Sequence, residues 1–265
     1  MFTPKIIFFD IDDTLYRKES DTVRPSVALA LRALKARGIL TAIATGRPPV
    51  AIPPKIKALI AETGTDMLVT INGQYVEFRG KPLHTAAMNT DTLAAMAAYF
   101  DGKNIPYAFV NHAEIAVSEP VPQVETALAD ILPVHPTDKY YFRTAPVYQM
   151  LAFYSADRDQ EVAGDIAAAG LQTVRWHKQA VDMLPVGHSK AQGITAAIAK
   201  LGIAMQDVMA FGDGLNDVEM LQSVGFGVAM GNGAAAAKAA ARHICPSVDE
   251  DGVYRGLKDL GIIDG

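Results

Sequence analysis

Strand-like and helix-like segments alternate through the first third of this chain, and that alternation restricts the fold more than any other feature. Residues 6–10, 39–44 and 67–71 are short apolar runs with strand character, whereas residues 25–37 carry apolar side chains at helical spacing. Gly38 follows this helical segment, as glycine commonly follows a helix end. Strands that alternate with helices predict an α/β fold built on a parallel sheet.

The first strand-like run leads directly into Asp10, Asp12 and Asp13. Ligands of open parallel sheets bind beyond the carboxyl ends of the strands, so we expect chemistry at this position. Neighbouring carboxylates repel one another, and Mg²⁺, which prefers oxygen ligands, would neutralise them. An acidic helix cap would have similar residues and is the alternative interpretation. A calcium-binding loop is excluded, because the glycine and glutamate that such a loop requires are missing.

Composition narrows the classes of protein to which the chain can belong. Half of its 265 residues are apolar, which is enough for a large core in one or two domains. The net charge of −5 and the lack of a basic run argue against a nucleic-acid partner, and no segment is long enough for a membrane span. With no signal-peptide core and a single cysteine, Cys245, we expect a soluble, cytoplasmic protein without disulfides.

The pattern changes after Asn72 and returns near Ser189, which indicates one domain inserted into another. The intervening part contains a predicted hairpin around Arg79-Gly80, further strand candidates and a segment rich in aromatic residues. We therefore expect a core domain formed by residues 1–82 and 188–265, and an inserted domain formed by residues 83–187.

A second strand-like run ends in groups that can bind phosphate. Thr45, Gly46 and Arg47 offer a hydroxyl, an open backbone amide and a guanidinium directly after residues 39–44. Threonine and glycine are also common in plain turns, so a turn without a ligand remains the alternative.

The segment that starts at Ser189 has the pattern of a capping box, which places Lys190 at the first helical position. The helix dipole disfavours a cation there by about 0.3–1 kcal/mol. A bound anion or a neighbouring carboxylate would account for this lysine, and so would a side chain that bends into water.

The strand-like run at 208–211 ends in Asp213, which stands between two glycines. Asn216 and Glu219 resemble a helix-capping pair, an arrangement that would place Asp217 in the first helical turn. Capping explains Asn216 and Asp217 but not Asp213, for which metal coordination is the better account.

Four polar segments resemble, in order, the four motifs of the haloacid dehalogenase superfamily of phosphotransferases. They are Asp-x-Asp at Asp10, Thr-Gly at Thr45, the lysine Lys190, and Gly-Asp-Gly-x-Asn-Asp at 212–217. The long interval before Lys190, together with Asn72-Gly73 and residues 227–232, is similar to the Cof-type branch (subfamily IIB), which carries an α/β cap at this point. The resemblance covers the whole chain and implies a Rossmann-like, doubly wound parallel-sheet core with an inserted α+β cap.

The resemblance also implies a role for each motif residue. Asp10 would be the nucleophile that forms an aspartyl-phosphate, Asp12 the general acid and base, and Mg²⁺ the cofactor, held by Asp10, the Asp12 backbone carbonyl and Asp213. The phosphoryl oxygens would be bound by Thr45, Gly46, Lys190 and Asn216, with Asp217 orienting Lys190 or the metal-bound waters, and with Arg47 and Asn72 as candidate substrate contacts.

One residue departs from the family pattern, because most members have glycine or another small residue where this chain has Asp13. The family's contact there is a backbone amide, so we expect the Asp13 side chain to point away from the phosphate, and its role stays open.

The resemblance favours a phosphatase that acts on small phosphorylated metabolites, with sugar phosphates ahead of flavin mononucleotide, pyridoxal phosphate and nucleotides. A phosphomutase of the same superfamily and a catalytically silent phosphometabolite-binding protein are the alternatives. The sequence is compatible with a monomer or a homodimer.

Overall fold

The computed structural model describes residues 2–264 and divides into two compact units, each of which is described by itself. The first unit contains the chain up to Gly46, Pro53–His84 and the chain from Ser189 onward; the second contains Arg47–Ile52 and Thr85–His188. The sequence assigned all of residues 1–82 to the core, whereas Arg47–Ile52 belongs with the second unit. The backbone gives a reason, because the Val50 N–H donates to the carbonyl of His112 at 3.2 Å.

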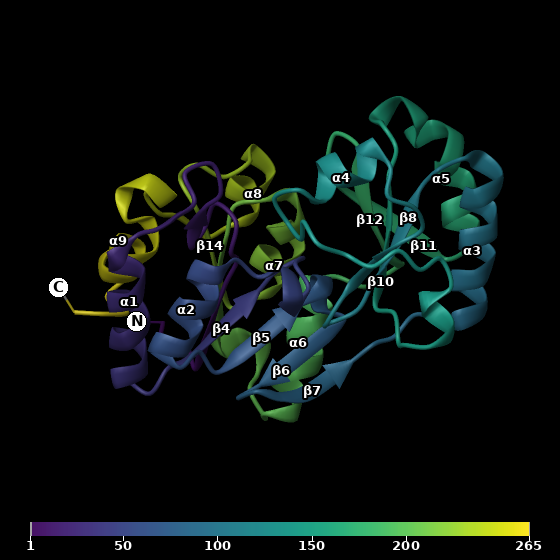
Figure 1. Cartoon of the computed structure of the whole chain (residues 1–265). Helices are drawn as coiled ribbons and strands as arrows, with labels where there is room; N and C mark the ends of the chain where they lie inside the picture. Colours follow the sequence, from purple (N-terminus) through teal and green to yellow (C-terminus); the bar gives the residue numbers. More distant parts are fainter. Residues whose placement is uncertain (1, 265) are drawn as a thin grey trace. The chain divides into compact units, whose positions relative to one another are not determined.

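The first unit is built on an eight-stranded sheet with the order β15-β14-β13-β1-β4-β5-β6-β7 (Figure 1). The strands are β1 Ile6–Phe9, β4 Leu40–Ala44, β5 Met67–Thr70, β6 Tyr75–Phe78, β7 Lys81–Thr85, β13 Val208–Gly212, β14 Phe226–Ala229 and β15 His243–Ile244. Pairing is parallel from β15 to β5 and antiparallel between β5 and β6. The predicted α/β fold with a parallel sheet is therefore confirmed.

Helices cover both faces of this sheet, as the apolar strands require. They are α1 Pro25–Ala36, α2 Pro54–Thr63, α6 Lys190–Lys200, α7 Val218–Ser223, α8 Ala235–Ala240 and α9 Gly252–Asp259. Contacts join α1 with α2 and α9, and join α6, α7 and α8 in a separate group. Ile6 and Phe8 of β1 pack with Ile194 of α6, while a Cβ on Gly256 of α9 would lie 3.4 Å from the Phe211 ring.

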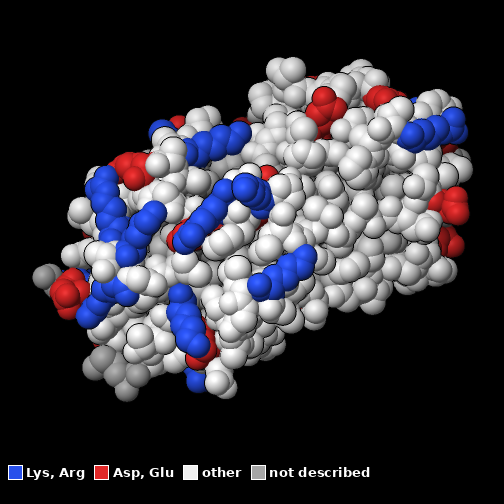
Figure 2. Space-filling model, turned by 90° about the horizontal axis from the view of Figure 1, so that it is seen from below, with Lys and Arg blue, Asp and Glu red and all other residues white. Residues whose placement is uncertain are grey.

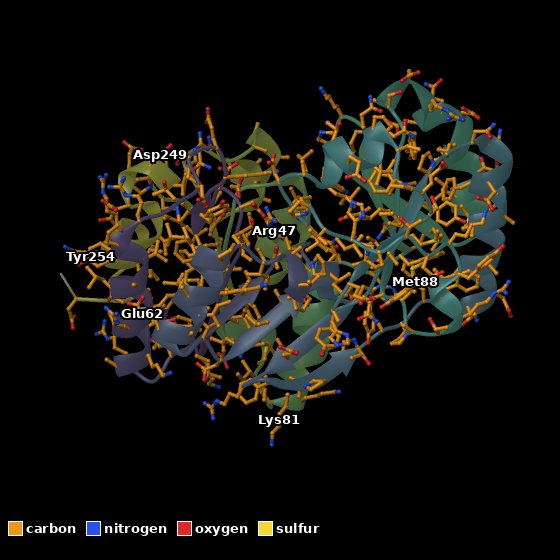
Figure 3. All side chains as sticks on the ribbon, viewed as in Figure 1. Arg47, Glu62, Lys81, Met88, Asp249 and Tyr254 are labelled. Carbon is orange, nitrogen blue, oxygen red and sulfur yellow. The ribbon has the colours of Figure 1, made fainter. Side chains whose placement is uncertain are left out.

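The predicted hairpin is present between β6 and β7. Its two turn residues, Arg79 and Gly80, have φ angles of 49° and 74°, the left-handed pair that a type I′ turn uses. Lys81, at the start of β7, projects outward beside this turn (Figure 3). The turn closes the antiparallel edge of the sheet, and β7 leads the chain from the first unit into the second.

The second unit has a five-stranded sheet with the order β11-β12-β10-β8-β9, and the strand pairs in it are antiparallel. Its elements are α3 Thr90–Lys103, β8 Tyr107–Val110, β9 Ile115–Val117, α4 Pro122–Leu128, β10 Gln149–Ala152, α5 Asp159–Ala168, β11 Leu171–His177 and β12 Ala180–Pro185. Phe100 of α3 and Ile166 of α5 share one buried cluster with Phe109 and Met150, so both helices cover the same face of the sheet. An antiparallel sheet with helices on one face gives this unit an α+β architecture.

The face drawn in Figure 2 carries charged side chains of both signs. Figure 2 shows lysines and arginines interspersed with uncharged side chains, and several of them lie beside aspartates or glutamates. Ion pairs of this kind include Lys5–Asp207 and Arg79–Asp66. Among residues 2–264, none of the helices combines the length and the apolar character that a membrane crossing requires.

Candidate active site

The parallel register brings three polar strand ends to one edge of the first unit's sheet. Phe9 of β1 pairs with Ile43 of β4 on one side and with Phe211 of β13 on the other. Asp10 therefore emerges beside the chain that continues to Thr45 and beside the chain that continues to Asp213. Phe9 and Phe211, which lie far apart in the sequence, are neighbours here because parallel strands present their carboxyl ends at the same edge.

Lys190 lies at the centre of this edge. Its Nζ donates to Asp10 Oδ1 at 2.6 Å and to Asp217 Oδ1 at 2.7 Å, and 1% of the lysine side chain is exposed. Burial alone would lower the lysine pKa, but the two carboxylates outweigh that effect and raise it above its ordinary value, so Lys190 is a permanent cation. The expected N-cap is present, since Ser189 Oγ accepts from the Gln192 N–H, but the lysine does not bend into water.

Asp217 organises the loop that follows β13. Its Oδ2 accepts from the backbone N–H of Asp213 at 3.0 Å and of Gly214 at 2.9 Å, while its Oδ1 accepts from Lys190. The expected capping role of Asn216 is wrong, because Asn216 is exposed inside the 3-10 turn η6 (Leu215–Asp217) and the N-cap position of α7 is Asp217, whose side chain makes no capping bond to that helix. In this 3-10 turn the carboxylate of Asp217 lies next to the backbone amides of Asp213 and Gly214, which precede the turn.

Thr14 is a site residue that the sequence reasoning missed. The residue is 1% exposed, and its hydroxyl donates to Asp213 Oδ1 at 2.9 Å. The bond links the loop after β1 to the loop after β13 and orients one carboxylate oxygen of Asp213. The available signal was a hydroxyl residue four positions after Asp10 in an otherwise acidic and apolar run.

The carboxylates of this site carry more negative charge than Lys190 balances. One oxygen each of Asp10, Asp213 and Asp217 lies within 4.8 Å of the others. Burial, with the charge of Asp217 second, raises the pKa of Asp213 to about 7. Burial also raises the pKa of Asp10 well above its usual range, against the opposing effect of Lys190.

This donor set fits a hard divalent cation such as Mg²⁺, which takes oxygen ligands and would supply the missing positive charge. Asp217 is a poor ligand within the set, because both of its oxygens already accept hydrogen bonds. Asp10 and Asp213 are therefore the carboxylates best suited to hold a metal ion, and Asp217 holds the lysine and the loop.

Thr45 and Gly46 follow β4 and are held by the next strand connection. The Thr45 N–H donates to Val69 O at 2.8 Å, and the Thr45 carbonyl accepts from the Asn72 N–H at 3.2 Å. A Cβ on Gly46 would lie 3.1 Å from Asn72 Oδ1, so the buried Asn72 side chain covers this glycine. Ile71 and Asn72 have φ angles of 52° and 50°, a strained conformation for isoleucine in particular.

The strained turn also sets the position of α6. A Cβ on Gly73 would lie 2.4 Å from Ser189 O, and a Cβ on Gly193 would lie 2.3 Å from the Gly73 Cα. The two backbones can approach this closely only because both residues are glycines. The strained turn therefore packs directly against the first turn of α6, the helix that begins with Lys190.

Asp12 and Arg47 are the two remaining residues that the sequence predicted for the site. Asp12 is partly exposed in the loop after β1, where it forms an isolated bridge with Tyr16. Arg47 belongs to the second unit, where its guanidinium donates to the carbonyl of Ala51 at 3.0 Å.

Comparisons with known proteins find relatives that match nearly the whole of this chain. A putative phosphatase, YkrA, from Bacillus subtilis is 32% identical over 98% of this chain and 98% of its own length. A putative bifunctional phosphatase/peptidyl-prolyl cis-trans isomerase from Streptococcus pyogenes is also 32% identical, over 98% of this chain but 54% of its own length.

A solved structure described as a HAD subclass IIB sugar phosphatase is 34% identical and superposes with a TM-score of 0.87, covering 98% of this chain and 100% of its own. The model of the haloacid dehalogenase-like hydrolases matches residues 7–257, which include all four polar segments. On this match, the chain belongs to the haloacid dehalogenase-like hydrolase family.

Proposed function

We propose that this phosphatase is Mg²⁺-dependent and hydrolyses small phosphorylated metabolites through a phosphorylated Asp10. The observation that supports this most strongly is the buried contact between Asp10 Oδ1 and the Lys190 ammonium at 2.6 Å. It holds a carboxylate in one orientation at the sheet edge where α/β proteins bind ligands. A carboxylate fixed in this way can attack phosphorus and divide one difficult displacement into two easier ones.

Asp12 is the proposed proton donor and acceptor. In the first step it would protonate the leaving oxygen of the substrate, and in the second it would remove a proton from the water that attacks the phosphoryl group on Asp10. It stands two residues from Asp10 and is partly exposed, so water can reach it.

The metal would be held by the Asp10 carboxylate, the Asp12 backbone carbonyl and Asp213. When bound, Mg²⁺ would neutralise charge between the carboxylate and the phosphoryl oxygens. Thr14 would keep Asp213 oriented through its 2.9 Å hydrogen bond, and Asp217 would keep the Asp213 backbone in place.

The phosphoryl oxygens would be bound by Thr45, the Gly46 amide, Lys190 and Asn216. Lys190 contributes a cation fixed by two carboxylates, and Asn216 contributes an exposed amide from the neighbouring loop. Asn72 and Arg47 are proposed substrate contacts. Asn72 covers Gly46, and Arg47 directly follows Gly46 in the chain.

Sugar phosphates are the first substrate class to test, because the sugar phosphatase of subclass IIB is 34% identical over almost the whole chain. The experiment is a screen for phosphate release from sugar phosphates, pyridoxal phosphate, flavin mononucleotide and nucleotides, each with and without Mg²⁺. Isomerised products are measured in the same reactions, so that a phosphomutase would be recognised.

The decisive variant in this screen is Asp10→Asn. It should abolish release from every substrate while leaving the circular dichroism spectrum unchanged, and Asp207→Asn, which changes a surface ion pair, is its matched control. If Asp10→Asn still released phosphate, the assignment of Asp10 as the nucleophile would be wrong.

A further inference from the structure

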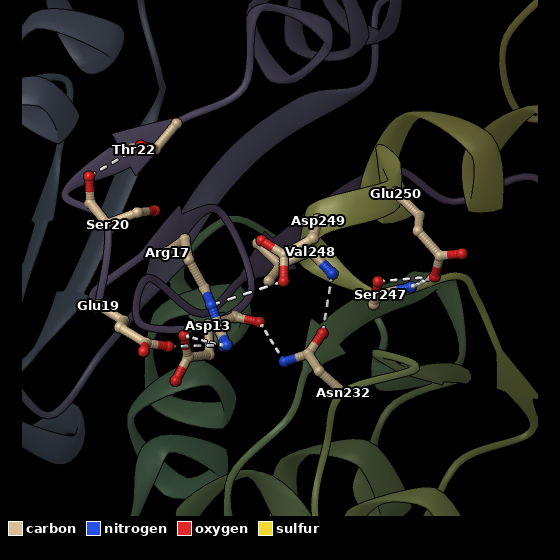
Figure 4. Close-up of polar contacts among 10 residues, drawn as sticks. All are labelled: Asp13, Arg17, Glu19, Ser20, Thr22, Asn232, Ser247, Val248, Asp249 and Glu250. Atoms are coloured by element: carbon tan, nitrogen blue, oxygen red, sulfur yellow. Dashed lines mark hydrogen bonds and ion pairs between the residues drawn. The ribbon is translucent and has the colours of Figure 1, made fainter.

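Asn232 joins two separate segments of the first unit through a single amide side chain. Its Nδ2 donates to the backbone carbonyl of Asp13 at 2.9 Å, and its Oδ1 accepts from the backbone N–H of Val248 at 2.8 Å (Figure 4). Val248 begins the 3-10 turn η7 (Val248–Glu250), which reciprocal bonds between Ser247 and Glu250 close. The amide thus uses its donor and its acceptor on different segments, which a carboxylate, an acceptor only, cannot do.

The backbone of Asp13 has a conformation that needs support. Its φ angle is 57°, in the left-handed region that few residues other than glycine, asparagine and aspartate adopt. The Asp13 N–H donates to Tyr16 O at 2.7 Å, and Asn232 holds the Asp13 carbonyl. Backbone contacts on both sides of this residue fix the end of the loop that contains Asp10 and Asp12.

The Asp13 carboxylate makes a second link to the same turn. Arg17, in the short strand β2 (Tyr16–Arg17), donates to Asp13 Oδ1 at 3.0 Å, and its Nε lies 3.6 Å from Asp249 Oδ2 (Figure 4). Asp249 is part of η7 and lies at the surface of the first unit (Figure 3). The contacts form a closed ring that runs from Asn232 through Asp13 and Arg17 to η7 and back to Asn232. Because Arg17 and Asp13 are partly exposed, solvent and salt weaken the ion pairs in this ring.

The loop that carries Asn232 also holds the segment around Asp213. The Ala234 N–H donates to Asp213 O at 2.8 Å, and the Met230 N–H donates to Gly212 O at 3.0 Å. A Cβ on Gly233 would lie 3.0 Å from the same Asp213 carbonyl, so this loop packs directly on that backbone. One loop therefore contacts both acidic segments of the site.

We propose that Asn232 is a positioning residue for the phosphatase reaction, whose amide sets the placement of the Asp10–Asp13 loop relative to Asp213. The Asp13 side chain belongs to the same ring, where it anchors the loop outward to Arg17. The proposal rests on the proposed roles of Asp10 and Asp213, but its structural part can be measured without catalysis.

The test replaces Asn232 by aspartate, which keeps the acceptor for Val248 and removes the donor to Asp13. Its matched control is Asn89→Asp: Asn89 caps α3 in the second unit and uses only its oxygen, which accepts from Asp91 and Thr92, so aspartate can replace it. A third variant, Asp13→Asn, keeps a residue suited to the left-handed backbone and removes the charge that binds Arg17.

Two readouts are compared in the three variants: steady-state phosphate release with Mg²⁺, and hydrogen exchange of the amides of residues 13–16 without substrate or metal. Asn232→Asp should lower kcat about tenfold, equivalent to about 1.4 kcal/mol of activation free energy, with KM changed less than twofold. The amides of residues 13–16 should exchange at least severalfold faster in this variant, and Asn89→Asp should match the original protein in both readouts. Asp13→Asn should lose less than threefold in kcat.

Unchanged kcat together with unchanged exchange in Asn232→Asp would overturn the proposal. Faster exchange throughout the first unit would also overturn it, since Asn232 would then support the fold in general. A loss of activity in Asp13→Asn as severe as in Asp10→Asn would assign the Asp13 carboxylate to the reaction instead. If no phosphoester is hydrolysed by the original protein, the proposed function fails, while the exchange comparison still decides the structural part.

Discussion

Lys190 and Asp10 form an ion pair at 2.6 Å in which 1% of the lysine side chain and 9% of the aspartate side chain are exposed. Burying two charges costs solvation free energy, and well-packed apolar residues often stabilise a fold equally well or better. Asp217 adds a third charge to the same buried place. Stability alone does not explain this arrangement, whereas the proposed binding of a phosphoryl group and a metal ion would explain it.

Replacing Lys190 by methionine should both inactivate and destabilise the protein. The variant leaves Asp10 and Asp217 buried without their cation, which we expect to lower the free energy of unfolding by about 3–5 kcal/mol. Urea denaturation and phosphate release measure the two effects. Lys200→Met, an exposed position on the same helix, is the control and should behave like the original protein. A stable, inactive Lys190→Met protein would contradict the energetic part of this prediction.

Replacing Thr14 by valine should weaken metal binding more than it weakens the fold. Valine has nearly the shape of threonine but cannot donate to Asp213, so the carboxylate loses one of the contacts that orient it. We expect about a tenfold higher Mg²⁺ concentration for half-maximal activity, with rescue by Thr14→Ser. Thr63→Val removes a buried hydroxyl bound to Leu59 O and should leave the Mg²⁺ requirement unchanged. If the Mg²⁺ requirement were the same in all these proteins, Thr14 would have no role in metal binding.

The raised pKa of Asp213 predicts a pH-dependent cost to folding in metal-free protein. Its folded pKa of about 7 exceeds the ordinary value of 3.8, so folding favours the protonated form. The cost is absent below about pH 4, grows as the pH rises to about 7, and stays constant above that. Asp213→Asn removes it and should therefore be more stable than the original protein at pH 8, with the difference shrinking toward pH 4. Urea denaturation in EDTA measures this difference, and a difference independent of pH would contradict the assignment.

Metal removal should abolish turnover without unfolding the protein. The uncompensated charge on Asp10 and Asp213 is what the ion would balance, so EDTA should stop phosphate release and added Mg²⁺ should restore it. Mg²⁺ should also raise the unfolding temperature at pH 8, and less so in Asp213→Asn. Full activity in EDTA would show that the carboxylates act without a metal.

The sequence predicted the first unit's elements well where local pattern and topology agree. The apolar run before Asp10 became a buried central strand, and the stripe on the helix that begins at Pro25 faces the core through Leu31 and Leu34. A parallel sheet then places Asp10 and Asp213 together, because the neighbouring strands β1 and β13 end at the same edge, and Lys190, the first residue of α6, contacts Asp10 there.

Other features depend on tertiary contacts that no local pattern records. The chain at Arg47–Ile52 packs with the second unit through a backbone bond to His112, and sequence periodicity carries no sign of it. Asn216 does not cap α7 because a 3-10 turn precedes the helix and moves its N-cap to Asp217, whose carboxylate binds the amides of Asp213 and Gly214. The left-handed Ile71 is disfavoured by its own side chain and is held there by the packing of Gly73 against the start of α6.

We expect Asp10 to carry the phosphoryl group during turnover, and chemical trapping can detect it there. An acyl phosphate is reduced by borohydride to an alcohol, so enzyme quenched during turnover should contain homoserine at position 10, detected by peptide mass spectrometry. The conversion should require substrate and should be absent in Asp10→Asn. Phosphate release with no modification of Asp10, or with the modification at Asp12 or Asp213 instead, would contradict the account.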